Sequence, residues 1–244
     1  MNETVKLRPD GFRERGGEVT RIEAFVDAAF AFSLTMLVIS VGVIPDSIPK
    51  LLEAFKGTPA FAACFAQIAL FWYEHMTWSR RYGLDDRGSI VLSLVLVFLV
   101  MVYIYPLKYM FGSFFGWITG GWLSSGVNVH SMGDLRTMFV IYGVVFGTMS
   151  IVLSLLYLQA WRQRHAMGLS LDECVATYES IARGWVMAGV ATVSLIVACI
   201  LPEWSPPWMQ GAPGMVYALM FLNGPVPAWY GRRMRSRLLA DRSA

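Results

Sequence analysis

Six long apolar stretches constrain the fold of this 244-residue chain more than any other feature. A helix needs about 20 apolar residues to cross the hydrocarbon core of a bilayer. Prolines, glycines or charged residues bound the stretches, as in "IPDSIP" after the first and "SRRYGLDDRG" after the second. We therefore expect an all-α membrane protein with six transmembrane helices, at about 21–44, 58–79, 88–113, 136–161, 182–202 and 212–231.

The composition agrees with a membrane location. Hydrophobic residues make up 56% of the chain and charged residues only 15%, whereas about a quarter of the residues of a soluble domain are charged. The first twenty residues are polar and contain no apolar core of a signal peptide, so we expect the first stretch to remain a membrane span. The net charge of +3 gives no case for a nucleic-acid partner, and the expected partner is the lipid bilayer.

The basic residues predict an orientation. Sixteen of the twenty Lys and Arg residues share one side if the N-terminus, the 80–87 loop, the 162–183 segment and the C-terminus lie on that side. Cytoplasmic loops carry such an excess, so both termini are expected in the cytoplasm. The domain division is then a cytoplasmic segment over 1–20, a six-helix transmembrane domain over 21–231 and a basic cytoplasmic tail over 232–244.

No metal or cofactor is expected. The three cysteines are odd in number and lack the CxxC spacing of a zinc site; they are Cys64, Cys174 and Cys199. Glu74 and His75 are adjacent and could join Asp27 in an intramembrane enzyme. The chain contains no HExxH or GxSxG sequence, which argues against that hypothesis.

Asp27 is a lone carboxylate near the start of the first apolar stretch. An ionised carboxylate is costly inside a bilayer unless it faces a partner or water. Near a helix N-terminus the helix dipole also favours a negative charge. The charge pattern alone therefore leaves open whether Asp27 holds a helix in place or belongs to a pathway for something that crosses.

One face of the first helix is small and mildly polar. At helical spacing this stripe contains Ala28, Ala31, Phe32, Thr35, Val38, Ile39 and Gly42. Small residues let membrane helices approach closely. Alternatively, several copies of the stripe could line a pore, with hydroxyls offering oxygen to a cation and an apolar ring acting as a gate. Spacing alone does not choose between these uses.

The segment "RIEAFVD" resembles the first-span signature Arg-x-x-x-Phe-Ser-Asp of the transmembrane protein 175 family, through Arg21, Phe25 and Asp27. This family comprises lysosomal-type potassium channels and their prokaryotic relatives. The pair Trp72-x-x-His75 near the end of the second stretch adds to the resemblance. The short basic loop that follows, with Asp85 and Asp86, adds to it as well. So does Pro106, the proline at the end of the third stretch.

The resemblance implies a potassium-permeable cation channel assembled as a homotetramer of six-helix subunits, without a re-entrant selectivity loop. The first helix would line the pore, with Phe32 at the apolar gate position and Thr35 at the hydroxyl position. Ala28, Ala31 and Ile39 would lie along the same face. No cofactor is implied beyond permeant K⁺, and the location would be the bacterial plasma (inner) membrane, as a multi-pass protein.

The resemblance also implies a structural network. Arg21, Phe25 and Asp27 would tie the cytoplasmic half of the first helix to its neighbours, with Trp72 and His75 as partners from the second. The chain departs from the family pattern where Val26 replaces serine, Ala28 replaces glycine and the bulky Phe32 occupies the gate position.

Two alternatives to a channel stay open. One is a non-conducting scaffold, whose small stripe only packs helices. The other is a secondary transporter, which usually has broken helices in matching halves. Here only the last stretch contains internal prolines, Pro225 and Pro227, and no matching interruption occurs elsewhere.

Overall fold

The computed structural model describes residues 7–15, 17–40, 45–123, 131–202 and 204–243. Within these ranges the regular secondary structure is helical, apart from an isolated bridge between Leu7 and Arg13, and turns and loops join the helices. The elements are α1 (Arg21–Ile39), α2 (Ile48–Lys56), α3 (Thr58–Tyr82), α4 (Arg87–Ile118), α5 (Met132–Arg162), α6 (Leu171–Ile200), α7 (Pro207–Gln210), α8 (Ala212–Met215), the 3₁₀ helix η1 (Val216–Asn223) and α9 (Pro225–Ser243).

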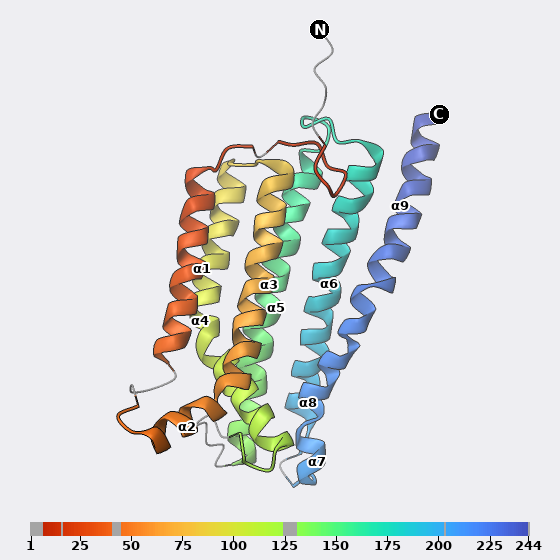
Figure 1. Ribbon diagram of the computed structural model, residues 1–244. Helices are drawn as coiled ribbons and strands as arrows, with labels where there is room; N and C mark the ends of the chain where they lie inside the picture. The colour runs from red at the N-terminus through yellow and green to blue at the C-terminus, as the bar shows by residue number, and fades with distance from the viewer. Residues whose placement is uncertain (1–6, 16, 41–44, 124–130, 203, 244) are drawn as a thin grey trace.

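The long helices form one bundle. Figure 1 shows α1, α3, α4, α5 and α6 running alongside one another, with α9 beside α6. Residues 7–15 and the last turns of α9 lie at the same end of the bundle, the upper end in Figure 1, which we call the terminal end. The opposite end carries α2, α7 and α8 and is called the distal end.

Length and hydropathy qualify four of the described helices to cross a membrane: α1, α4, α5 and α6. A fifth qualifies if α2 and α3, which meet at a bend of 46°, form one broken span. The span expected over 212–231 is not one continuous α-helix, because the chain there is divided into α8, η1 and the start of α9. Proline lacks an N–H donor and clashes with the preceding turn, and Pro225 stands where η1 gives way to α9.

Aromatic side chains and glycines pack the bundle interior. Phe71, Tyr103, Tyr142 and Phe146 are buried and contact one another edge-on, tilted or stacked, with ring centroids 5.5–6.5 Å apart. Helices α5 and α6 approach each other closely at Gly184, where a Cβ atom would collide with Ser154 Oγ. These contacts hold the four helices α3, α4, α5 and α6 together as a scaffold, and α1 packs against it.

Candidate pore-forming surface

The helix α1 packs against α3 and α4 through one of its faces. The side chains on that face are buried, and they are Glu23, Val26, Ala29, Phe30, Ser33 and Leu37. Thr20 caps the helix start, where its side chain accepts a hydrogen bond from the N–H of Glu23 at 3.2 Å. The spacing of the buried residues, three or four apart, is that of one side of an α-helix. The opposite side of α1 is therefore left uncovered by the residues that the structure describes.

That uncovered side holds every residue expected to line a pore: Ala28, Ala31, Phe32, Thr35 and Ile39 are all exposed. Phe32 exposes 54% of its surface and Ile39 63%, which is unusual for large apolar side chains unless lipid or another protein surface covers them. Gly42, also assigned to this stripe, lies outside the described residues. The sequence stripe and the exposed face of α1 thus coincide wherever the structure describes them.

The hydroxyl of Thr35 is oriented by its own helix. Thr35 Oγ1 donates a hydrogen bond of 3.0 Å to the carbonyl oxygen of Ala31. A hydroxyl has one proton to donate and two lone pairs that accept. Since the proton points back to the helix, the lone pairs of Thr35 stay available on the exposed face, as an oxygen ligand for a cation would need.

Asp27 is held by α3. Trp72 Nε1 donates a hydrogen bond of 2.8 Å to Asp27 Oδ1 across the α1–α3 contact. His75 lies one turn further along α3, is buried, and forms a hydrogen bond of 3.0 Å with Ser93 Oγ of α4. The structure therefore brings Asp27 and Trp72 together and uses His75 to join α3 to α4.

Arg21 and Phe25 stand apart from this network. Both lie on the exposed side of α1, and Phe25 exposes 53% of its surface. Among the residues that the structure describes, Arg21 makes no hydrogen bond or ion pair. Within the described part of this single chain, both lie on the uncovered side of α1 and not on the side that packs against α3 and α4.

Glu23 supplies a tie that the sequence interpretation missed. Its carboxylate is buried and accepts a hydrogen bond of 3.1 Å from Arg80 Nε at the end of α3. A buried carboxylate without a partner is expensive, so Arg80 is needed where it stands. The sequence features that could have indicated this ion pair are a carboxylate in the first turn of α1 and two adjacent arginines, Arg80 and Arg81, at the end of α3.

Residues 7–15 form a folded strap across the terminal end. Phe12 is only 2% exposed, meets Tyr82 edge-on at 5.8 Å between ring centroids, and lies under the guanidinium of Arg81. Arg81 Nε also donates to Asp10 Oδ2 at 3.0 Å. The strap is thereby attached to the end of α3 by an aromatic, a cation–π and an ionic contact.

Glu173 fastens the strap to α6. This carboxylate, 1% exposed, accepts hydrogen bonds from Arg15 Nη1 at 2.7 Å and Nη2 at 3.0 Å. The backbone N–H groups of Arg13 and Ser170 donate to it as well, each at 2.8 Å. Ser170 and Glu173 form a capping box at the start of α6. One side chain therefore caps a helix and holds the strap.

Asp86 joins α4 to α5 from the loop before α4. Its carboxylate accepts hydrogen bonds from Gln159 Nε2 at 2.9 Å and Gln163 Nε2 at 3.0 Å, as well as from Ser89 and the N–H of Gly88. Burial by itself would raise the pKa of Asp86, but the hydrogen bonds from Ser89, Gln163, Gln159 and Gly88 outweigh it and lower the pKa below its ordinary value.

Glu74 belongs to a link between helices. Tyr157 of α5 donates a hydrogen bond to Glu74 Oε2 at 3.4 Å, and Arg183 of α6 lies 3.5 Å from Oε1. His75, its neighbour in sequence, is turned to α4 instead. Within the described part of the chain, no group of three or more His, Cys, Asp and Glu side chains is arranged to hold a metal ion.

Residues 21–106 match the model of the family described as endosomal/lysosomal potassium channel TMEM175. A curated protein of Marivirga tractuosa named "Potassium channel" is 34% identical to this chain over an alignment of 247 positions, gaps included. The alignment covers 97% of this chain and 97% of that protein. The match thus extends along nearly the whole chain.

Two solved structures of potassium channels have the same fold as this chain. The potassium channel MtTMEM175, crystallised as a threonine-to-alanine variant with a nanobody–MBP fusion protein, has a TM-score of 0.77 at 32% identity, covering 95% of this chain and 100% of that one. A lysosomal potassium-selective channel TMEM175 homolog from Chamaesiphon minutus shares the fold, with a TM-score of 0.54 at 18% identity over 84% of this chain and 97% of that one. These relatives are channels, not enzymes, and the chain is a multi-pass membrane protein that belongs to the TMEM175 potassium channel family.

Proposed function

We propose that this chain forms a potassium-permeable cation channel in which α1 of each of four copies lines the pore. The observation that carries the proposal is the uncovered stripe of α1: it is continuous, lies opposite the packed face and contains an oriented hydroxyl between bulky apolar residues. A lipid-facing helix needs neither the small Ala28 and Ala31 nor a hydroxyl at Thr35.

In this proposal Phe32 is the gate. Four phenylalanine rings around an axis form an apolar constriction, which excludes water and thereby raises the energy of a passing ion. Thr35, one turn beyond Phe32, offers a ring of hydroxyl oxygens that replace part of the hydration shell of K⁺. No cofactor takes part, and K⁺ is the permeant ion.

In this proposal Asp27 holds α1 in place and does not itself line the pore. Its hydrogen bond with Trp72 fixes the terminal half of α1 against α3, so the stripe beyond it keeps one orientation toward the axis. Arg21 and Phe25 continue the uncovered stripe at the terminal end. In a tetramer they would meet neighbouring copies and complete their structural role there.

The topology that goes with the proposal has six crossings. Helix α3 makes one of these crossings after the 46° bend that separates it from α2, and the broken segment from α8 through α9 supplies the sixth. Both termini lie in the cytoplasm of a bacterium, and the protein lies in its inner membrane. Residues 1–20 are then a cytoplasmic segment, 21–231 the channel domain and 232–244 a basic cytoplasmic tail.

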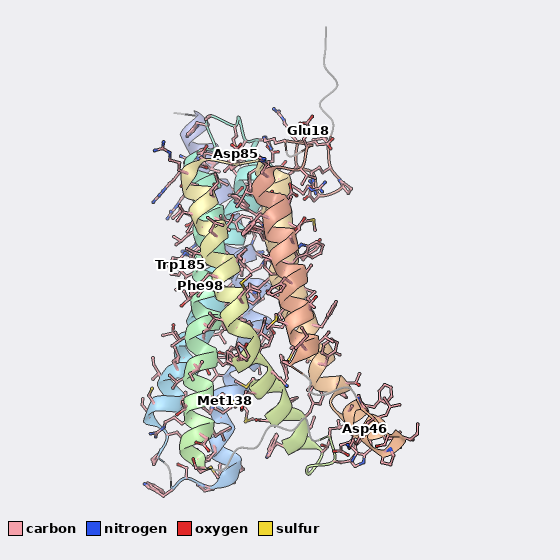
Figure 2. The ribbon with its side chains drawn as sticks, turned by 90° about the vertical axis from the view of Figure 1, so that its left-hand side faces the viewer. Glu18, Asp46, Asp85, Phe98, Met138 and Trp185 are labelled. Carbon is pink, nitrogen blue, oxygen red and sulfur yellow. The ribbon has the colours of Figure 1, made fainter. Side chains whose placement is uncertain are left out.

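Planar-bilayer recording of the purified protein under bi-ionic K⁺ and Na⁺ conditions tests the proposal. Phe32→Ala should raise the current severalfold because it widens the constriction, and Thr35→Val should shift the reversal potential because it removes the oxygen ring. Phe98→Ala is the matched control, since Phe98 is an exposed phenylalanine of α4 (Figure 2) and should leave both properties unchanged.

Two results would contradict the proposal. Silence of both the unmodified protein and the Phe32→Ala variant would favour a non-conducting scaffold. Counterflow of a substrate across liposomes without passive cation flux would favour a secondary transporter.

A further inference from the structure

The helix α2 has an apolar side that no described part of the chain covers. Ile48, Leu51, Leu52 and Phe55 fall within an arc of about 100° on this nine-residue helix. All four are exposed, Ile48 at 68% and Leu52 at 61%. No residue of α2 is buried, and among the described elements α2 contacts chiefly α3.

The polar side of α2 is neutralised within the same segment. Lys50 Nζ lies 2.8 Å from Asp46 Oδ2, and Lys56 Nζ lies 2.7 Å from Glu53 Oε2. These two ion pairs leave no unbalanced charge among the four residues. A partner of α2 therefore need not carry charge, and attraction must come from burial of the apolar side.

The position of α2 indicates what covers that side. Figure 1 shows α2 at the distal end, between α1 and α3, and the axes of α2 and α3 differ by 46°. In Figure 2, where Asp46 is labelled beside α2, the segment stands clear of the bundle. It thus leaves the bundle near the level at which α1 ends and α3 begins.

Tryptophans at the same end support a bilayer boundary at this level. Trp117 at the end of α4, Trp122 just after it and Trp208 in α7 are all exposed. Tryptophan is enriched where a membrane meets water. A short amphipathic helix at that boundary lies in the membrane surface, with its apolar side toward the acyl chains.

We propose that α2 is an interfacial helix whose apolar side inserts into the bilayer surface at the distal end, with uncharged phospholipid as its partner. It would hold the distal ends of α1 and α3 at a fixed depth. The proposal depends on the chain crossing a membrane and not on ion conduction.

Spin labels on single cysteines test the proposal in phosphatidylcholine vesicles. The exposed Cys199 is first replaced by serine, whereas Cys64 and Cys174 are buried and can stay. Labels at Leu51→Cys, Leu52→Cys and Phe55→Cys should collide severalfold more often with oxygen than with a water-soluble nickel chelate. Labels at the control positions Lys50→Cys and Glu53→Cys should show the reverse. Adding phosphatidylglycerol should change neither pattern.

Three results would overturn it. Frequent nickel collisions at all five positions would mean that α2 lies in water. Protection of positions 51, 52 and 55 from both reagents, with disulfides forming between copies, would mean that a second copy covers the apolar side. Oxygen contact that appears only with phosphatidylglycerol would mean that charge, and not apolar burial, draws α2 to the surface.

Discussion

Trp72 of α3 donates a 2.8 Å hydrogen bond to the carboxylate of Asp27 on α1. This bond joins the helix with the uncovered stripe to the scaffold behind it. Because Asp27 and Trp72 lie 45 positions apart in the sequence, the contact is tertiary and reports how the first two long helices are docked.

Removing this bond should weaken the docking of α1. Hydrogen bonds between membrane helices contribute about 0.6 kcal/mol on average and up to about 1.7 kcal/mol, so Trp72→Phe should lower the thermal unfolding midpoint modestly. Asp27→Asn keeps an acceptor oxygen and should cost less than Asp27→Leu. Trp185→Phe is the control, since Trp185 is an exposed tryptophan of α6 (Figure 2). Equal midpoints for Trp72→Phe and Trp185→Phe would show that the bond contributes nothing.

The ion pair between Arg15 and Glu173 should contribute much more to the free energy of unfolding than a surface ion pair does. Breaking a buried pair leaves an uncompensated charge, at a cost of about 3 kcal/mol, so Glu173→Gln and Arg15→Gln should each destabilise the protein strongly. The double variant should recover part of the loss. Lys50→Gln breaks an exposed pair and should cost about 1 kcal/mol or less. Denaturant titration would measure all four, and equal losses for Arg15→Gln and Lys50→Gln would refute this ranking.

Phe12 should control whether the strap stays attached. Phe12→Ala removes the ring that meets Tyr82 and supports Arg81, so residues 7–15 should detach while the bundle stays folded. Trypsin should then cleave after Arg13 and Arg15 many times faster than in the unmodified protein. Phe12→Leu, which keeps an apolar side chain, should lie between the two. Unchanged cleavage in Phe12→Ala would mean that the polar contacts alone hold the strap.

Acid should destabilise the protein through Asp86. Because the folded-state pKa of this carboxyl lies below its unfolded value, the unfolded chain binds the proton more readily and stability falls as pH drops. The contribution of ionised Asp86 to the free energy of unfolding is fully present above the pKa of the carboxyl in the unfolded chain, about 3.9. It disappears as the pH falls below the pKa in the folded protein. Asp86→Asn should flatten the stability–pH curve in that acidic window, which denaturation at several pH values would measure. A slope identical to that of the unmodified protein would contradict the assignment.

The elements with strong local signals were predictable. The long apolar stretches gave the approximate places of α1, α3, α4, α5 and α6, and the 3.6-residue spacing of Ala28, Phe32 and Thr35 gave the exposed side of α1. The capping box of Ser170 and Glu173 was also present in the sequence, as a serine followed three positions later by a glutamate.

Other features depend on tertiary contacts that no local pattern reveals. Residues 7–15 look like a polar terminal segment, yet one phenylalanine and a buried carboxylate some 160 positions away fold them onto the bundle. No helix was expected between the first two stretches, where "IPDSIP" served only as a boundary, although proline is well tolerated in the first turn of a helix, where Pro49 stands in α2. The last apolar stretch had the length of a span, but its prolines divide it.

The most direct test of the central claim is silver block of Thr35→Cys channels in a planar bilayer, in a Cys199→Ser background. If α1 lines the pore, Ag⁺ follows the path of K⁺, binds the introduced thiolate and abolishes the current, whereas Phe98→Cys in the same background stays open. A Thr35→Cys current that persists in saturating Ag⁺ would contradict the account and place the pathway elsewhere.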